Sequence, residues 1–266
     1  MAIHLNKNIL IMRIVHFLFL LILSLFSIKS LSQQTQKNYA FADSIKSVAI
    51  IELFSSEDCS SCPEADAMVN KIALDAANAR QPVFVLEEHV DYLNHFGWKD
   101  TFANKQFEDR QLAYQHFFKK NASYTPQILV NGTREVYAAN LSMADLVIEE
   151  ALKIPSQVNI TFSINNYADS TAEADYHLSS INKNWIINFA VVQKIGVSHV
   201  TAGENSGRTL THLNIVEQLQ SDNITIPDGI MPLMHLPLYK PNTYSIIVFV
   251  QDKQTMKIVG ATQMDI

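Results

Sequence analysis

The stretch AIIELFSSEDCSSCPEADAMVNKIA, from Ala49 to Ala73, contains both cysteines of the chain, Cys59 and Cys62. An apolar run that begins at Val48 and ends at Phe54 predicts a buried central strand. After the cysteines, Pro63 is well placed for the first turn of a helix. Apolar residues then recur at helical spacing, at Ala65, Met68, Val69, Ile72 and Ala73. The two cysteines therefore lie between a predicted strand and the start of a predicted helix.

This position favours reactive thiols. The N-terminus of a helix carries unpaired N–H groups and the positive end of the helix dipole, which stabilise a thiolate. The two-residue spacer brings the second sulfur within bonding reach of the first. We expect Cys59 to be the more exposed, attacking sulfur and Cys62 to be the resolving one. The same spacing occurs in zinc half-sites and in disulfides that only hold a fold together, so three interpretations stay open at this point.

The elements that follow predict a mixed sheet. A second buried strand spans residues 82–90, and a long aromatic loop and a helix come after it. Asn131-Gly132 between two apolar runs is a strong hairpin signal. Ser142 fits as the N-cap of a closing helix. Parallel strands joined by helices, followed by an antiparallel pair, predict a mixed sheet with helices on both faces.

A proline stands directly ahead of the predicted hairpin, in Thr125-Pro126. The order of elements from Val48 to Lys153 resembles thioredoxin, with the cysteine pair after the first strand and the proline before the hairpin. The resemblance implies an α/β thioredoxin-like domain in which the Thr125–Pro126 bond is cis. It also implies that Pro126 shapes a groove for an extended substrate beside the dithiol. Only about 5–6% of X–Pro bonds are cis, so this expectation depends on the topology.

Several longer segments resemble those of one particular family. They are ELFSSEDCSSCPEAD, HVDY, GWKD, YTPQILVNG and GENSGRTLTH. Together they resemble a domain-of-unknown-function family of secreted, thioredoxin-like bacterial proteins, over nearly all of the chain after residue 32. The resemblance implies the fold and no established activity. The chain departs from the family pattern at Leu93, where a tryptophan is expected.

Other residues are candidates for the same site. His89 and Asp91 follow the second strand, at the sheet edge where α/β folds place their sites, and are candidates for proton transfer beside Cys59. Thr125 and Trp98 are assigned to the substrate-binding surface, although Trp98 also fits a small core under the aromatic loop.

A polar, glycine-containing segment in the second half of the chain, GENSGRTLTH, is hard to explain by packing. We expect it to fold over the dithiol, with Glu204 and Arg208 on the substrate-binding surface. Acidic residues surround the cysteines in sequence, so Arg208 would supply the positive charge that the local sequence lacks. The alternative is a loop that only fixes the orientation of two domains.

The chain changes character at Pro155. Beyond it, segments of alternating polarity predict antiparallel strands of a β-sandwich-like domain. Residues 203–219 are expected to be irregular and then helical. The predicted organisation is a signal peptide (1–32), a linker (33–46), a thioredoxin-like domain (47–154) and the β-sandwich-like domain (155–266).

The N-terminus and the composition bear on location and partners. Basic residues precede the apolar run 14–28, which is shorter than the roughly 20 residues of a membrane-spanning helix, and this pattern predicts a secretory signal peptide. We expect a secreted or periplasmic protein without a stable membrane span after cleavage. The net charge of −6 and the scattered basic residues argue against nucleic acid as a partner.

The sequence thus predicts thiol–disulfide exchange at Cys59 and Cys62, with an unidentified protein or a small thiol or disulfide as partner. No metal and no cofactor beyond the dithiol are expected. A zinc site would need histidines such as His89, His95 or His116, and these lack the usual ligand spacing. The rival from another class is a binding or assembly module in which the disulfide is a structural staple. The surrounding carboxylates favour it, since they disfavour a thiolate and make a disulfide harder to reduce.

Overall fold

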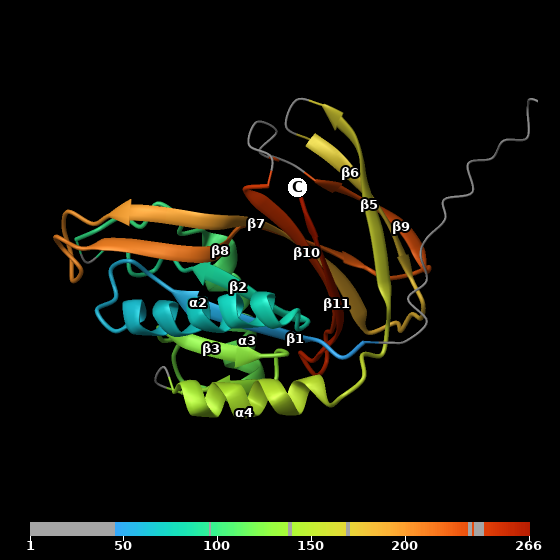
Figure 1. Ribbon diagram of the computed structural model, residues 1–266, viewed down its shortest axis with the longest axis horizontal. Helices are drawn as coiled ribbons and strands as arrows, with labels where there is room; N and C mark the ends of the chain where they lie inside the picture. Colours follow the sequence, from blue (N-terminus) through green and yellow to red (C-terminus); the bar gives the residue numbers. More distant parts are fainter. Residues whose placement is uncertain (1–45, 96, 138–139, 169–170, 234–235, 237–241) are drawn as a thin grey trace, which may run out of the picture. The chain divides into compact units, whose positions relative to one another are not determined.

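The computed structural model describes residues 46–266, except 96, 138–139, 169–170, 234–235 and 237–241 (Figure 1). The predicted signal peptide lies outside the described residues. In the described part of the chain, no helix has both the length and the apolar character needed to cross a bilayer. The helices are α2 (Cys62–Ala79), α3 (Lys105–Phe118) and α4 (Leu141–Leu152). The strands are β1 (Ala49–Ser55), β2 (Val83–His89), β3 (Gln127–Val130), β4 (Arg134–Val136), β5 (Ile160–Ala168), β6 (Thr171–Leu178), β7 (Trp185–His199), β8 (Thr209–Asn223), β9 (Asp228–Leu233), β10 (Tyr244–Asp252) and β11 (Ile258–Asp265).

One mixed sheet of eight strands runs through most of the described chain, in the order β11-β10-β7-β8-β2-β1-β3-β4. β1 pairs in parallel with β2 and antiparallel with β3, as the predicted strand, crossover and hairpin require. The second sheet has three antiparallel strands, β5-β6-β9. The prediction of a mixed sheet with helices, accompanied by antiparallel strands, is confirmed.

The large sheet joins the two halves of the sequence. β8 lies beside β2, with Ile215 opposite Glu87. The sheet therefore continues across residues 154 and 155, between which the sequence predicts a domain boundary. The division into two domains stays a prediction, because the pairing describes the sheet and not the independence of its halves.

Helices cover both faces of the N-terminal strands. Successive residues of β1 point to opposite faces. Ala49, Ile51 and Leu53 pack in one core with α2 and α4. Ile50 and Phe54 pack in another with α3 and with β7, β8 and β10. A third core lies between the small sheet and the outer strands β7, β10 and β11, and Phe189 is one of its largest members.

Two local predictions need correction. The N-cap of α4 is Asn140, whose side chain accepts a hydrogen bond from the Met143 backbone N–H at 3.0 Å, and not Ser142. The segment expected to turn helical after residue 203 instead forms β8, which is hydrogen-bonded along β7 from His199–Thr209 to Ile186–Asn223.

A cluster of buried charged residues links α3 to the large sheet. Arg110 donates from Nε to Glu52 Oε1 at 2.5 Å and lies 3.4 Å from Glu88 Oε1. Tyr114 donates its hydroxyl to the other oxygen of Glu52. Glu52 and Glu88 are fully buried, and Arg110 is the cation that compensates them. Burial raises the pKa of Glu88 well above its ordinary value, against the lowering effect of Arg110.

Candidate functional site

The cysteines lie where the sequence predicts them. Cys59 is in the turn that follows β1, and Cys62 is the first residue of α2, with Pro63 in the first turn. The two sulfurs form a disulfide, with Cα atoms 5.4 Å apart. Cys59 is 7% exposed and Cys62 is fully buried, so the predicted order of exposure is confirmed while both residues are shielded from solvent. Cysteines in a disulfide offer no thiolate to a metal, so zinc binding at this pair would require its reduced form.

The Thr125–Pro126 peptide bond is cis, as expected. Pro126 directly precedes β3, whose first residue, Gln127, lies opposite Phe54 of β1. The proline therefore stands at the end of β1 from which the cysteine turn departs.

Glu135 of β4 holds the segment that carries this bond. Its carboxylate accepts hydrogen bonds from the Tyr124 hydroxyl at 2.5 Å and from the Gln127 side chain at 2.9 Å, and it lies 2.9 Å from the Lys120 ammonium. Burial by itself would raise the pKa of Glu135, but hydrogen bonds, first among them that of Tyr124, lower it to about 2.

Glu135→Gln should therefore destabilise the protein only where the carboxylate is ionised. The pKa falls from an ordinary 4.5 in the unfolded chain to about 2 in the folded one, so this stabilisation is complete above pH 4.5 and is lost as the pH falls toward 2. Solvent screening reduces the effect to about 1 kcal/mol. Urea denaturation at pH 7 and pH 3 measures it. The control, Glu150→Gln, removes an exposed pair with Arg134 and should change little at either pH. An effect of Glu135→Gln that grew at pH 3 would contradict the assignment.

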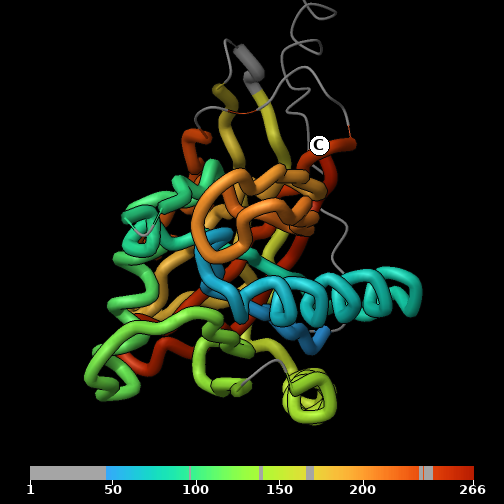
Figure 2. The backbone as a smooth tube through the Cα atoms, turned by 90° about the vertical axis from the view of Figure 1, so that its left-hand side faces the viewer, coloured from blue at the N-terminus to red at the C-terminus, as the bar shows by residue number. Residues whose placement is uncertain are grey.

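The segment around Glu204 docks on the cysteine turn, as the sequence predicts (Figures 1 and 2). The tip of the β7–β8 hairpin, coloured orange, lies beside the blue turn between β1 and α2. The Glu204 backbone N–H donates to Asp58 Oδ1 at 2.7 Å, and Glu204 Oε2 accepts from the Ser60 N–H at 2.8 Å. Asn205 is buried and donates from Nδ2 to the carbonyls of Glu57 (2.8 Å) and Cys59 (2.9 Å). The hairpin tip thus binds the backbone of the turn on either side of Cys59.

Gly203 permits this close approach. Its φ is +75°, and a Cβ atom there would lie 2.7 Å from Asp58 Cγ and 2.9 Å from Trp98 Cβ. Trp98 takes part in the same packing and donates from Nε1 to Glu57 Oε2 at 2.6 Å. Trp98 is half-buried and therefore belongs to the wall that holds the turn.

Arg208 contributes indirectly. It is exposed, and its Nη1 donates to Asn205 Oδ1 at 2.8 Å. It thereby orients the amide that binds the Cys59 carbonyl. The docking of the segment is confirmed, whereas a direct electrostatic effect of Arg208 on Cys59 stays a prediction.

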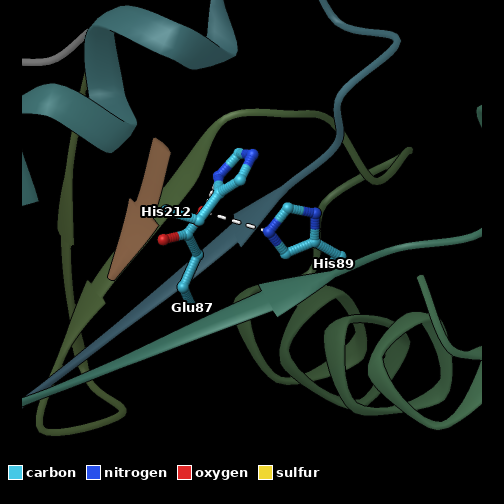
Figure 3. A group of neighbouring side chains, drawn as sticks. All are labelled: Glu87, His89 and His212. Atoms are coloured by element: carbon cyan, nitrogen blue, oxygen red, sulfur yellow. Dashed lines mark hydrogen bonds and ion pairs between the residues drawn. The ribbon is translucent and has the colours of Figure 1, made fainter. Parts of the chain in front are cut away.

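Behind the turn lies a group of buried polar residues, which we call the buried His cluster. Its members are Glu57, Asp66, Glu87, His89, Asp100 and His212. His89 donates from Nδ1 to Asp100 Oδ2 at 2.6 Å and from Nε2 to Glu87 Oε1 at 3.0 Å. His212 donates from Nδ1 to the same Glu87 oxygen at 2.6 Å (Figure 3). β2, β8, α2 and two loops thus bring four carboxylates and two imidazoles together.

The cluster reaches the cysteines through two residues. Glu57 lies two positions before Cys59, and Asp66 lies one helical turn after Cys62, on the same side of α2. Asp66 accepts a hydrogen bond from the Ser55 hydroxyl at 2.7 Å, and its other oxygen lies 3.7 Å from His212 Nδ1.

The electrostatics of the cluster favour charged imidazoles. Burial alone would lower the pKa of His89, but the charge and hydrogen bonds of Asp100 and Glu87 raise it well above its usual value. Burial would likewise lower the pKa of His212, whereas Glu57 and Glu87 raise it to about 9. Burial raises the pKa of Asp66 to about 7, and the negative charge of Glu87 adds to this. The carboxylates of the cluster can therefore keep two protonated imidazoles in the protein interior.

The remaining candidates from the sequence lie in different parts of the structure. His89 is fully buried, and both ring nitrogens are bound by carboxylates. Asp91 lies instead beside Glu108 of α3, where it raises the pKa of that carboxyl. His89 therefore binds Asp100 and Glu87, whereas Asp91 lies beside Glu108, and the role of either residue in proton transfer stays a prediction. Thr125 lies in the cis bond with Pro126.

Sequence reasoning missed Glu57, Glu87, Asp100, Asn205 and His212. A direct signal existed for one of them, because Glu87 and His89 alternate on a strand predicted to be buried, which demands polar partners. For His212 the signal was indirect: it ends the segment GENSGRTLTH, which is expected to fold over the dithiol, but its bond to Glu87 spans 125 positions.

Comparison with known proteins supports the fold. A crystal structure of an Agrobacterium tumefaciens protein, solved by a structural genomics consortium, matches with a TM-score of 0.62 and 23% identity, over 82% of this chain and 95% of that one. A domain of the outer membrane lipoprotein Omp28 from Porphyromonas gingivalis matches with a TM-score of only 0.27 and 12% identity, over 42% of this chain and 88% of that one. Among curated proteins none matches. A family model described as protein of unknown function (DUF1223) matches residues 50–251, and the chain therefore belongs to the DUF1223 family.

Proposed function

We propose that this protein carries out thiol–disulfide exchange through Cys59 and Cys62, on a thioredoxin-like fold. One observation carries the proposal: the disulfide joins the N-terminal end of α2 to the turn before it, with the cis proline at the neighbouring strand end. The helix terminus stabilises a departing thiolate at Cys62. The greater exposure of Cys59 supports its role as the sulfur that meets the substrate.

The exchange proceeds in two displacements. A substrate thiolate attacks Cys59 Sγ, the Cys59–Cys62 bond breaks, and Cys62 leaves with the electron pair as a thiolate. A second substrate thiolate then attacks the substrate sulfur of the mixed disulfide, and Cys59 leaves. The substrate dithiol is oxidised to a disulfide while the protein disulfide is reduced to a dithiol, and the reverse sequence reduces a substrate. The partner is a protein or a small molecule that carries a thiol or a disulfide.

We also propose that the protein works outside the cytoplasm, as a secreted or periplasmic protein. The basic and apolar N-terminal segment supports this location, and so does the disulfide, since such bonds persist in oxidising compartments.

A second candidate function is a binding module in which the disulfide is a staple. The observation in its favour is the hairpin tip, which covers the turn and binds the Cys59 carbonyl. The reduction potential separates the two candidates. A value near about −200 mV, typical of exchange proteins, supports catalysis, and a value below about −300 mV supports the staple.

Trapping provides the direct test. With a disulfide-containing peptide, Cys62→Ser should accumulate a mixed disulfide through Cys59: the Cys59 thiolate attacks one peptide sulfur, the other leaves as a thiolate, and the resolving sulfur is gone. Cys59→Ser should accumulate none. Wild-type protein should oxidise the dithiol form of the peptide or reduce its disulfide, and each single variant should lose this activity. Mass spectrometry of the adducts and a turnover assay measure these results. Absence of turnover together with a potential below about −300 mV would eliminate exchange in favour of the staple.

A further inference from the structure

The buried His cluster has the arrangement of a metal centre. Glu87 and His89 alternate on β2 and so face the same side, and His212 faces them from β8. One donor atom from each of the three residues lies within 4.8 Å of the other two. A tetrahedral ion with bonds of 2.0–2.1 Å holds its ligand atoms about 3.3 Å apart. The observed separations of 3.0 Å and 2.6 Å between Glu87 Oε1 and the two ring nitrogens therefore require only small adjustments.

Each imidazole has a second carboxylate near the ring nitrogen that faces away from Glu87. His89 presents Nε2 to Glu87 while Asp100 binds its Nδ1 at 2.6 Å. Asp100 is fixed in turn by the backbone N–H groups of Glu57 and Phe102, each at 2.9 Å. His212 presents Nδ1, and its Nε2 lies 3.6 Å from Glu57 Oε1. A carboxylate on the far nitrogen of a histidine is the usual outer sphere of a protein metal site, because it fixes the ring orientation and raises the basicity of the ligand.

Hydrogen bonding alone leaves this cluster incomplete. Within the described residues, Glu87 Oε2, His212 Nε2 and Glu57 Oε1 are buried and have no hydrogen-bond partner. Buried polar atoms normally have partners, since an unsatisfied one loses its hydrogen bonds to water without replacement. A cation bound by both carboxylate oxygens of Glu87 would give Oε2 the partner that it lacks.

Asp66 is the candidate for a fourth ligand, although its oxygens are not among the donor atoms that all lie within 4.8 Å of one another. Asp66 Oδ2 lies 3.7 Å from His212 Nδ1, and the other Asp66 oxygen accepts a hydrogen bond from the Ser55 hydroxyl.

Aromatic packing fixes the two imidazoles. The rings of His89 and His212 lie nearly perpendicular, with centroids 4.7 Å apart, and Phe102 packs against both in edge-to-face contacts. Gly196 makes room for this packing, because a Cβ atom there would lie 2.8 Å from Phe102 Cζ.

We propose that Glu87, His89 and His212 bind a zinc ion, and that Asp66 moves closer to become the fourth ligand. The inference goes beyond the proposed exchange function and departs from the sequence-based expectation of no metal. Two imidazoles and carboxylate oxygens in a tetrahedral set suit zinc, and a buried, closed set of four protein ligands is typical of a structural site. The zinc ion would link β2 and α2 to β8. β8 is the strand that begins directly after the hairpin tip, and this tip covers Cys59.

The test uses the full chain after treatment with a chelator. Titration calorimetry with zinc and visible absorption with cobalt(II), as a spectroscopic substitute, should both show one ion per chain and a tetrahedral cobalt spectrum. Zinc should also raise the melting temperature, because it binds the folded state. A double Cys59→Ser, Cys62→Ser variant should bind zinc as the wild type does, since neither sulfur is a ligand.

Four single variants complete the design. His212→Ala and Glu87→Gln should weaken zinc binding by more than the roughly 10- to 100-fold that loss of an outer partner costs, and Asp100→Asn should weaken it within that range. The control is His199→Ala. His199 is an exposed histidine of β7, the strand paired with β8, and its side chain is hydrogen-bonded to Thr209. This variant should bind zinc as the wild type does. Glu87→Gln keeps the shape of the side chain, so its binding remains interpretable if His212→Ala does not fold. Failure of the stripped wild type to bind zinc or cobalt, or unchanged binding by Glu87→Gln, would overturn the proposal. Neither outcome depends on exchange activity.

Discussion

Gly203→Ala is expected to destabilise the protein by about 2–4 kcal/mol and to open the disulfide to reductant. The new Cβ would meet Asp58 and Trp98, and the backbone at φ +75° disfavours any L-residue with a side chain. The hairpin tip cannot then keep its hydrogen bonds to the turn, including the one from Asn205 to the Cys59 carbonyl. Urea denaturation measures the loss of stability, and the rate of reduction by dithiothreitol measures access to Cys59.

Gly207→Ala is the matched control for this variant. Gly207 also has a positive φ, of +82°, but a Cβ atom there would have no neighbour within 4 Å. The control should therefore show only the backbone cost of about 1–2 kcal/mol, with little change in the rate of reduction. Equal effects of the two substitutions on reduction would mean that the docked tip does not control access to the disulfide.

Arg110→Met is expected to cost about 3–5 kcal/mol in the free energy of unfolding at pH 7. The guanidinium is the cation that lies against Glu52 and Glu88, and its removal leaves these buried acidic groups uncompensated, Glu52 foremost, since burial already raises the pKa of Glu88 well above its ordinary value. The cost should shrink at low pH, where protonation neutralises them. Adding Glu52→Gln and Glu88→Gln to Arg110→Met should restore much of the lost stability, because no buried charge is then unpaired. Denaturation of the single and triple variants measures both effects.

Lys105→Met provides the comparison on the same helix. Lys105 is 59% exposed and pairs with Glu108 and Asp109 at the surface, so its loss should cost no more than about 0.5 kcal/mol. An Arg110→Met cost as small as this would show that the fold does not need the buried cation.

The parts of the fold that the sequence predicts correctly depend on local chemistry. The apolar run of β1, Pro63 at the start of α2 and the Asn131-Gly132 turn each act within a few residues, and Asn131 and Gly132 have the positive φ values that such a turn requires. Residues 203–219 are expected to be irregular and then helical, and Leu210, Leu213, Val216 and Leu219 do recur at helix-like intervals in the part that forms β8. Its long ladder with β7 overrides this pattern.

In the candidate site, too, the residues set by local patterns could be predicted from the sequence, and those set by long-range contacts could not. Cys59, Cys62 and the cis bond at Pro126 follow from motifs and order along the chain. The docking of Glu204 follows from the unusual polarity of its segment. The buried His cluster could not be assembled from the sequence, because Glu87 and His212 meet only through the pairing of β2 with β8, a contact between distant halves that no local pattern encodes.

The distance along the chain between the disulfide and its cover also has a consequence in time. Asn205 is 146 residues beyond Cys59, and synthesis proceeds at about 5–20 residues per second, so the thiols emerge roughly 7–30 s before the residue that covers them. During that interval both sulfurs are open to whatever oxidises them. Once the hairpin arrives, its tip closes over the finished bond. The newborn chain and the mature protein therefore present the same two cysteines to their surroundings in different ways.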